Sequence, residues 1–78
     1  MLVSSIGETI KKRRKQLGIT QPHLAELANV NINTLYKLES GIGNPSLDVL
    51  NKLAEVLGME LKIEVKKITL NEINGNLL

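Results

Sequence analysis

The chain has 78 residues, a net charge of +2 and no cysteine. This length supports one domain with a small core, for which pairing with a second copy is a common source of stability. Disulfides and cysteine-based zinc sites are excluded, a single histidine cannot form a metal site of its own, and no apolar run approaches the roughly 20 residues that cross a membrane. We therefore expect no metal or cofactor and, since nothing resembles a secretion signal, a cytoplasmic protein.

The charge is unevenly placed along the chain. Residues 1–20 carry five basic residues, in the run Lys11–Lys15, against the single acid Glu8, whereas residues 21–78 carry five lysines against seven acids. Such a basic end could face an anion, although an ordinary solvated helix face explains the run about as well. Tyr36 is the only aromatic residue, which argues against single-stranded nucleic acids because these bind on aromatic stacking surfaces.

The first predicted helix begins near Ser5 and ends at Gly18. Ser5 and Glu8 have the spacing of a capping box, which satisfies free backbone N–H groups of a first turn. Gly18 supplies the left-handed residue that commonly follows a helix. The face that we expect to be buried is formed by Ile6, Ile10 and Leu17, with Arg14 between them.

A second start signal follows immediately and predicts a short helix over Gln21–Ala28. Thr20 is a good N-cap, and Pro22 is tolerated in a first turn because an N–H group there has no partner within the helix. The apolar face of this helix consists of Leu24, Leu27 and Ala28, with Ala25 beside them.

The stretch from Asn29 to Gly41 begins by alternating polar and apolar residues, as a half-buried strand would, yet its second half is typical of a helix. We interpret it as a turn followed by a third helix over Ile32–Ser40, with Asn31 as N-cap and Gly41 after its end. In this interpretation the inward residues are Val30, Leu35 and Leu38, and the exposed first turn holds Ile32 and Asn33.

The fourth predicted helix is the clearest one in the sequence. Gly41–Pro45 forms the loop before it, Ser46 caps it, and it extends over Leu47–Leu57 until Gly58 ends it. Its apolar residues follow the spacing of one helix face and are Leu47, Leu50, Leu53, Ala54 and Leu57.

Residues 59–67 alternate between apolar and charged side chains, which predicts a β-strand with one buried face made by Leu61, Ile63 and Val65. Apart from the first three residues, the chain has no second strand candidate, and an unpaired strand edge favours pairing with another copy. We therefore expect a homodimer closed by an antiparallel two-stranded ribbon. Residues 68–78 form either a flexible tail or a short helix.

Two short helices joined by a tight turn, the second with a polar front, have the plan of a helix-turn-helix unit. In such a unit the first helix crosses the DNA backbone and the second places its N-terminal residues in the major groove. Here the pair is Gln21–Ala28 and Ile32–Ser40. Ala25 is small enough for the two helices to approach, and Asn29 tolerates the left-handed conformation of a tight turn.

Two segments resemble the Xre family of bacterial and phage helix-turn-helix regulators, which includes the lambdoid repressors, namely IKKRRKQLGITQPHLAELANVNINTLYKLESG and NPSLDVLNKLAEVLG. The resemblance covers about residues 6–58, and four motifs stand at the family's spacing: G-x-T-Q, L-A-x-x-A, L-x-x-L-E-x-G and N-P-S-L. It implies a lambda-repressor-like bundle of four short helices. The strand that follows is similar to the dimerisation strand of HipB-type antitoxins, whose partner toxin is a kinase-like protein.

The resemblance also implies which residues contact DNA. Bases would be read by residues of the third helix, which are Ile32, Asn33 and Lys37. The DNA backbone would be contacted by Gln21, Asn31, Thr34 and Asn44. The chemistry of the first set agrees, because an asparagine can bond adenine, a lysine can bond guanine and an isoleucine can touch a thymine methyl group.

Two further implications concern charged residues. Arg14 would form an ion pair with Glu39, and a buried pair of this kind mainly fixes geometry rather than adding stability. The sequence departs from the family at Ile42 and Gly43, where a basic residue is common, so that one phosphate contact is lost. The residues that could replace this contact are Lys11, Lys12, Arg13 and Lys15.

The sequence therefore predicts a mainly α-helical DNA-binding domain over residues 1–58, a dimerisation strand over 59–67 and a tail over 68–78. We expect a transcriptional repressor of bacterial or phage origin that binds a palindromic operator on double-stranded DNA as a homodimer. The favoured role is the antitoxin of a toxin–antitoxin pair that regulates its own operon. A stand-alone repressor and an interaction module without DNA binding are the alternatives. No residue pair resembles a catalytic site, so we expect no enzyme activity.

Overall fold

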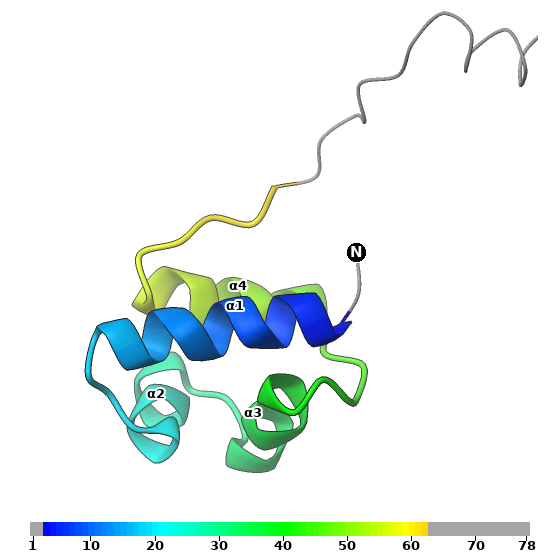
Figure 1. Cartoon of the computed structure of the whole chain (residues 1–78), viewed down its shortest axis with the longest axis horizontal. Coiled ribbons are helices and arrows are strands. Elements are labelled where there is room, and N and C mark those ends of the chain that lie inside the picture. The colour runs from blue at the N-terminus through cyan, green and yellow to red at the C-terminus, as the bar shows by residue number, and fades with distance from the viewer. Residues whose placement is uncertain (1–2, 63–78) are drawn as a thin grey trace, which may run out of the picture.

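The structure is a computed structural model that describes residues 3–62, and these residues form four helices. The helices are α1 (Val3–Gln16), α2 (Gln21–Ala28), α3 (Ile32–Glu39) and α4 (Leu47–Val56). Figure 1 shows α1 and α4 in one layer and α2 and α3 in a second layer below it. The predicted bundle of four short helices is confirmed. None of these helices combines the length and the apolar character that crossing a membrane requires.

One leucine-rich core holds the two layers together. Its fully buried side chains come from α2, α3 and α4 and from the residue after α4, and they are Leu24, Leu35, Leu38, Leu53 and Leu57. Burying one such side chain contributes about 1.5–3 kcal/mol. From α1, Ile10 joins this core and Ile6 packs against it. These residues were all predicted to face inward.

Three leucines that the pattern placed in the core are exposed instead, namely Leu17, Leu27 and Leu47. Leu17 and Leu47 stand at helix ends, where none of the four described helices covers them. Leu27 is exposed because the buried face of α2 is formed by Leu24, Ala25 and Ala28, and a step of about 100° per residue turns Leu27 away from its centre. An eight-residue helix is too short for the apolar pattern to define one face.

Three of the four helix starts agree with the sequence. The side chains of Thr20, Asn31 and Ser46 accept hydrogen bonds from backbone N–H groups of the first turns of α2, α3 and α4. The start of α1 was predicted wrongly, because α1 begins at Val3 and Ser5 already lies within it. Helical backbone at Ser5 is incompatible with the extended conformation of an N-cap, and its carbonyl accepts from Thr9 Oγ1 at 2.9 Å.

All four helices end in the same way, with a left-handed residue and two backbone hydrogen bonds that form a Schellman motif. The left-handed residues are Gly18, Asn29, Gly41 and Gly58. The residue after each of them is apolar, and three of these four, Ile19, Val30 and Met59, pack against the core. Ile42 differs, because 58% of it is exposed. Both α3 and α4 end one residue earlier than predicted, at Glu39 and Val56, because Ser40 and Leu57 are the caps.

The first residues of the predicted strand, Met59–Lys62, form no strand. A strand needs a second strand to bond its backbone N–H and C=O groups, and residues 3–62 contain none that could pair with these residues. The remainder of that prediction, including Ile63 and Val65, and the tail over 68–78 lie outside the described residues. Leu61 is exposed by 41% and lines an apolar groove of about 360 Å³ between α1, α4 and residues 59–62.

The backbones of α1 and α3 come very close where the two helices meet, and this contact depends on Gly7. A Cβ atom on Gly7 would overlap the carbonyl oxygen of Leu38 and would come within 3.3 Å of the Glu39 Cα. Both neighbours are backbone, so neither can move without shifting the end of α3. Glycine at this position lets two helix backbones touch directly, and the sequence-based prediction gave it no role.

We expect Gly7→Ala to destabilise the fold by about 3 kcal/mol, because overpacking a close contact costs roughly 1–3 kcal/mol and here the obstacle is backbone. At an open helical position the same change stabilises by about 0.5–1 kcal/mol. Urea unfolding followed by circular dichroism measures the change in the free energy of unfolding. Its sign shows whether Gly7 lies at a close contact or at an open helical position. A variant that is more stable than the parent would show that α1 and α3 do not meet at Gly7.

Candidate nucleic-acid interface

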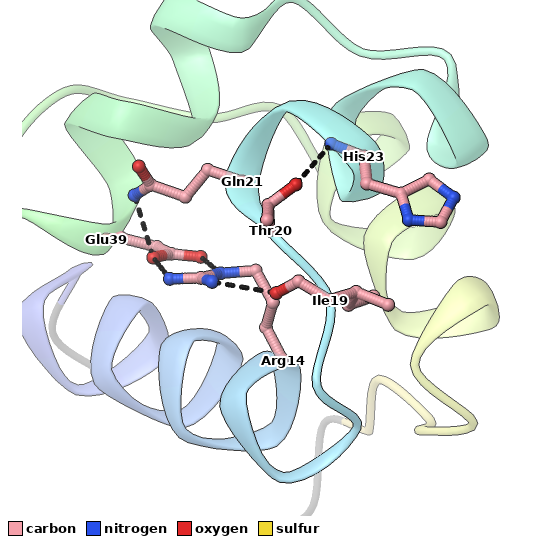
Figure 2. A network of polar contacts seen from close by, with 6 residues as sticks. All are labelled: Arg14, Ile19, Thr20, Gln21, His23 and Glu39. Atoms are coloured by element: carbon pink, nitrogen blue, oxygen red, sulfur yellow. Dashed lines mark hydrogen bonds and ion pairs between the residues drawn. The ribbon is translucent and has the colours of Figure 1, made fainter.

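A buried ion pair joins α1 to the end of α3. Arg14 Nε donates to Glu39 Oε2 at 2.8 Å and Arg14 Nη2 donates to Glu39 Oε1 at 2.8 Å, so the contact is bidentate. Only 8% of Arg14 and 7% of Glu39 are exposed. This is the pair that the family resemblance implied, and Figure 2 shows the two planar groups facing one another.

The same two side chains also bind the segment between α1 and α2. Arg14 Nη1 donates to the backbone carbonyl of Ile19 at 2.9 Å, and Gln21 Nε2 donates to Glu39 Oε1 at 2.9 Å (Figure 2). The hydrogen bond to Glu39 raises the pKa of Arg14 above its usual value, against the opposing effect of burial. No buried side-chain nitrogen or oxygen among the described residues lacks a partner. The network therefore ties α1, the start of α2 and the end of α3 into one unit.

Gln21 was predicted to contact the DNA backbone, and the structure shows that it also belongs to this network. Its amide nitrogen carries two protons, and one of them serves Glu39. The second remains available for a phosphate oxygen, and Gln21 is only half-buried. One side chain at the first position of α2 can therefore bond both the interior and a phosphate.

The predicted base-reading residues differ in how far they are exposed. Asn33 and Lys37 are exposed and stand four residues apart, so they share one face of α3. Ile32 is not the exposed first-turn residue that the sequence suggested, because it is half-buried and packs against the core. Part of its side chain therefore stabilises the fold, which reduces the surface it can offer to a base.

The predicted backbone-contacting residues of α3 are placed by local hydrogen bonds and packing. The Oδ1 atom of Asn31 accepts from the backbone N–H of Asn33 at 2.7 Å, which leaves the amide nitrogen of Asn31 to donate outward. Thr34 is half-buried, and Asn44 is exposed in the loop after α3. None of these side chains is enclosed by the fold.

A shallow notch brings some of the predicted residues together. It has a volume of about 200 Å³ and lies between α3 and the loop before α4, with Thr34, Lys37, Ile42, Gly43, Asn44 and Pro45 around it. Two residues expected to contact the backbone thus stand next to Lys37, which is expected to read a base. Asn33 and Gln21 lie outside the notch.

The charges around α2 and α3 suit an anion. Neither helix has an acidic residue in its first turn, whereas α4 has Asp48 there, and a helix N-terminus carries partial positive charge. The expectation that Arg13 faces phosphate is not supported, because Arg13 Nε donates to the carbonyl of Leu57 at the end of α4, at 2.9 Å. The exposed basic residues of α1 are Lys11, Lys12 and Lys15.

Comparison with known proteins finds similar chains. A family model described as Helix-turn-helix matches residues 10–63. An uncharacterized HTH-type transcriptional regulator of Methanothermobacter thermautotrophicus is 43% identical over 51 residues, which make up 65% of this chain and 74% of the relative. The immunity repressor protein of Bacillus phage phi105 is 38% identical over 66 residues, which make up 85% of this chain and 46% of the relative.

A third relative, from Methanocaldococcus jannaschii, is provisionally named an HTH-type transcriptional regulatory protein. It is 41% identical over 66 residues, which make up 85% of this chain and only 20% of that protein. The chain thus spans less than half the length of the phage and Methanocaldococcus jannaschii relatives. The comparison therefore concerns the helix-turn-helix unit and not the whole of those proteins.

The buried pair makes a testable prediction about stability. Arg14→Met and Glu39→Leu are each expected to cost about 3–5 kcal/mol, because each leaves the charge of the other residue buried without its charged partner. Replacing both residues, as Arg14→Met with Glu39→Leu, should cost less than about 1.5 kcal/mol because no charge remains buried. Urea unfolding of the parent, both single variants and the double variant measures the coupling. Single effects that simply add would contradict a mutual dependence.

Proposed function

Because the chain belongs to the Helix-turn-helix family, in which the related chains are named as transcriptional regulators and a phage repressor, we propose that it represses transcription by binding a specific sequence of double-stranded DNA. The observation that carries the proposal is the exposed polar face of α3, on a helix that the Arg14–Glu39 pair holds in one orientation. Its place of action is the cytoplasm, on promoter DNA of a bacterial or phage-derived operon.

In this proposal α3 enters the major groove with its N-terminal half. Asn33 bonds an adenine through its amide, and Lys37 donates to the O6 and N7 atoms of a guanine. Ile32 touches a thymine methyl group with the part of its side chain that the core leaves uncovered. Support comes from the shared face of Asn33 and Lys37 and from their exposure.

The DNA backbone is bound on both sides of α3. The side chains that donate to phosphates are those of Gln21, Asn31, Thr34 and Asn44. Each keeps at least one N–H or O–H group that no described hydrogen bond uses. Contacts with phosphates supply much of the affinity of such proteins, so binding should weaken steeply as the salt concentration rises.

We also propose that two copies bind together. A palindromic operator presents two equivalent half-sites, and a dimer with twofold symmetry places one α3 in each of two successive major grooves. The alternating sequence of residues 59–67 provides the means of pairing, as an antiparallel ribbon with Leu61, Ile63 and Val65 on its apolar face. The apolar groove that Leu61 lines supports this, because pairing with a second copy would cover it.

Two biological roles fit a regulator of this kind. The similarity of residues 59–67 to the dimerisation strand of HipB-type antitoxins supports an antitoxin that binds a kinase-like toxin and represses the shared operon. The phage immunity repressor among the relatives supports a stand-alone repressor. Purification of the chain together with the product of the adjacent gene separates the two. A stable complex supports the antitoxin role, whereas a chain that purifies alone and binds its own promoter supports the stand-alone role.

Combined replacement of Asn33 and Lys37 by alanine is expected to weaken binding to the selected DNA by at least about 30-fold. Each specific base contact contributes about 1–3 kcal/mol, and a loss of 2 kcal/mol corresponds to that factor. A mobility-shift titration with the promoter upstream of the gene measures the effect.

A matched control carries the same two changes on α4, as Asn51→Ala with Lys52→Ala, and should bind like the parent. Lys52 forms an exposed ion pair with Asp48 that contributes little to stability. If the α3 variant bound as tightly as this control, the base-reading assignment would be wrong. If the parent bound no DNA at all, the chain would be an interaction module that has kept only the fold.

The variant Ile63→Pro tests whether residues 59–67 pair two copies of the chain. Proline removes a backbone N–H group and cannot continue a central strand, so the ribbon should open and the protein should sediment as a monomer in analytical ultracentrifugation. Leu77→Pro, in the segment proposed as a tail, is the control and should leave the dimer intact. An unchanged dimer in Ile63→Pro would place the interface elsewhere.

A further inference from the structure

We propose that Gly43 is a positioning residue that orients Lys37 toward its base and thereby sets part of the DNA specificity. The inference rests on the proposed function, because it concerns the side chain that is expected to read guanine. Its evidence is the geometry of the loop between α3 and α4, which the family resemblance marks as a departure in this chain. In that loop an Ile-Gly pair replaces the usual basic residue.

The loop is fastened to α3 at the residue that it would orient. The backbone N–H of Ile42 donates to the carbonyl of Lys37 at 2.9 Å, and the N–H of Gly41 donates to the carbonyl of Leu38 at 3.0 Å. These two bonds form the Schellman motif that ends α3. They fold the chain back, so that Gly43 arrives beside the Lys37 side chain rather than beyond the end of the helix.

A side chain at Gly43 would fit beside Lys37 only if the lysine shifted by a few tenths of an ångström. A Cβ added to Gly43 would lie 3.3 Å from the Lys37 Cβ and 3.9 Å from its Cδ. The backbone of Gly43 therefore faces the aliphatic part of the lysine and leaves it the space that a Cβ would narrow, on one side of the notch that Thr34 and Asn44 also line. A free lysine side chain loses up to about 2 kcal/mol of rotamer entropy when it is ordered, and a wall on one side removes part of that loss before DNA binds.

Gly43 differs in this respect from the other glycine residues with positive φ. Gly18, Gly41 and Gly58 follow helix ends, where a left-handed residue is needed for the turn itself. Gly18 has a φ of +72°, and an added Cβ would meet nothing within 4 Å. Gly43 has a φ of +89° and does not terminate a helix, yet its added Cβ would press on Lys37. Backbone strain and side-chain contact can therefore be separated by comparing the two positions.

The test is selection of binding sequences from random double-stranded DNA with the full chain and its variants. We expect Lys37→Ala to lose about ten-fold of the preference for one base pair in the selected site. Gly43→Ala should reduce the preference at that same base pair by about five-fold or more, and at no other. Gly18→Ala imposes the same kind of backbone strain without touching Lys37, so its base preferences should equal those of the parent.

Each other outcome overturns a definite part of the inference. If Gly43→Ala kept the parent's preference at the base pair where Lys37→Ala loses it, Gly43 would not orient Lys37. If Gly43→Ala weakened binding to all DNA sequences equally, the loop would act in phosphate binding alone. A parent that enriches no sequence would refute the proposed function itself, which is a different result. Should Gly43→Ala fail to fold, Gly43→Asn adds the same Cβ with less strain at positive φ and carries the same expectation.

Discussion

The structure depends on one interaction, the bidentate pair between Arg14 and Glu39. A guanidinium that is removed from water must find partners for its N–H groups, and here these partners come from the end of α3 and from the carbonyl of Ile19. The crossing at Gly7 acts together with this pair, because it lets the two helix backbones come close enough for the side chains to meet.

Most of the fold could be predicted because its signals are local. The caps at Thr20, Asn31 and Ser46 and the left-handed residues at helix ends each act within about six residues, so the sequence around them is sufficient. The exposure of Asn33 and Lys37 also follows from their place on a short helix whose leucines face inward. The Arg14–Glu39 pair was different, since its two residues are far apart in the chain and only the family resemblance related them.

The features that escaped prediction are contacts between elements. Nothing near Gly7 indicates that another backbone will touch it, apart from the presence of a glycine within a helix. Within the run of basic residues in α1, Arg13 was grouped with the lysines as a candidate phosphate contact, yet it donates to the carbonyl of Leu57 while the lysines remain in water. Ile32 was expected to be exposed and is half-buried, whereas Leu27 was expected to be buried and is exposed. Both differences arise because a two-turn helix has too few residues to define its buried face.

The repeated Schellman motif at the helix ends has a consequence for how the chain folds. Each helix carries its own stop signal, so the residue at which it ends is set by the local sequence. Helices as short as α2, α3 and α4 are nevertheless marginal in water on their own, because few residues follow the costly first turn. They become stable when the leucine-rich core covers their apolar faces, and the Arg14–Glu39 contact that fixes α3 joins residues 25 positions apart. The stop signals therefore decide where each helix ends, whereas packing of the bundle decides whether it persists.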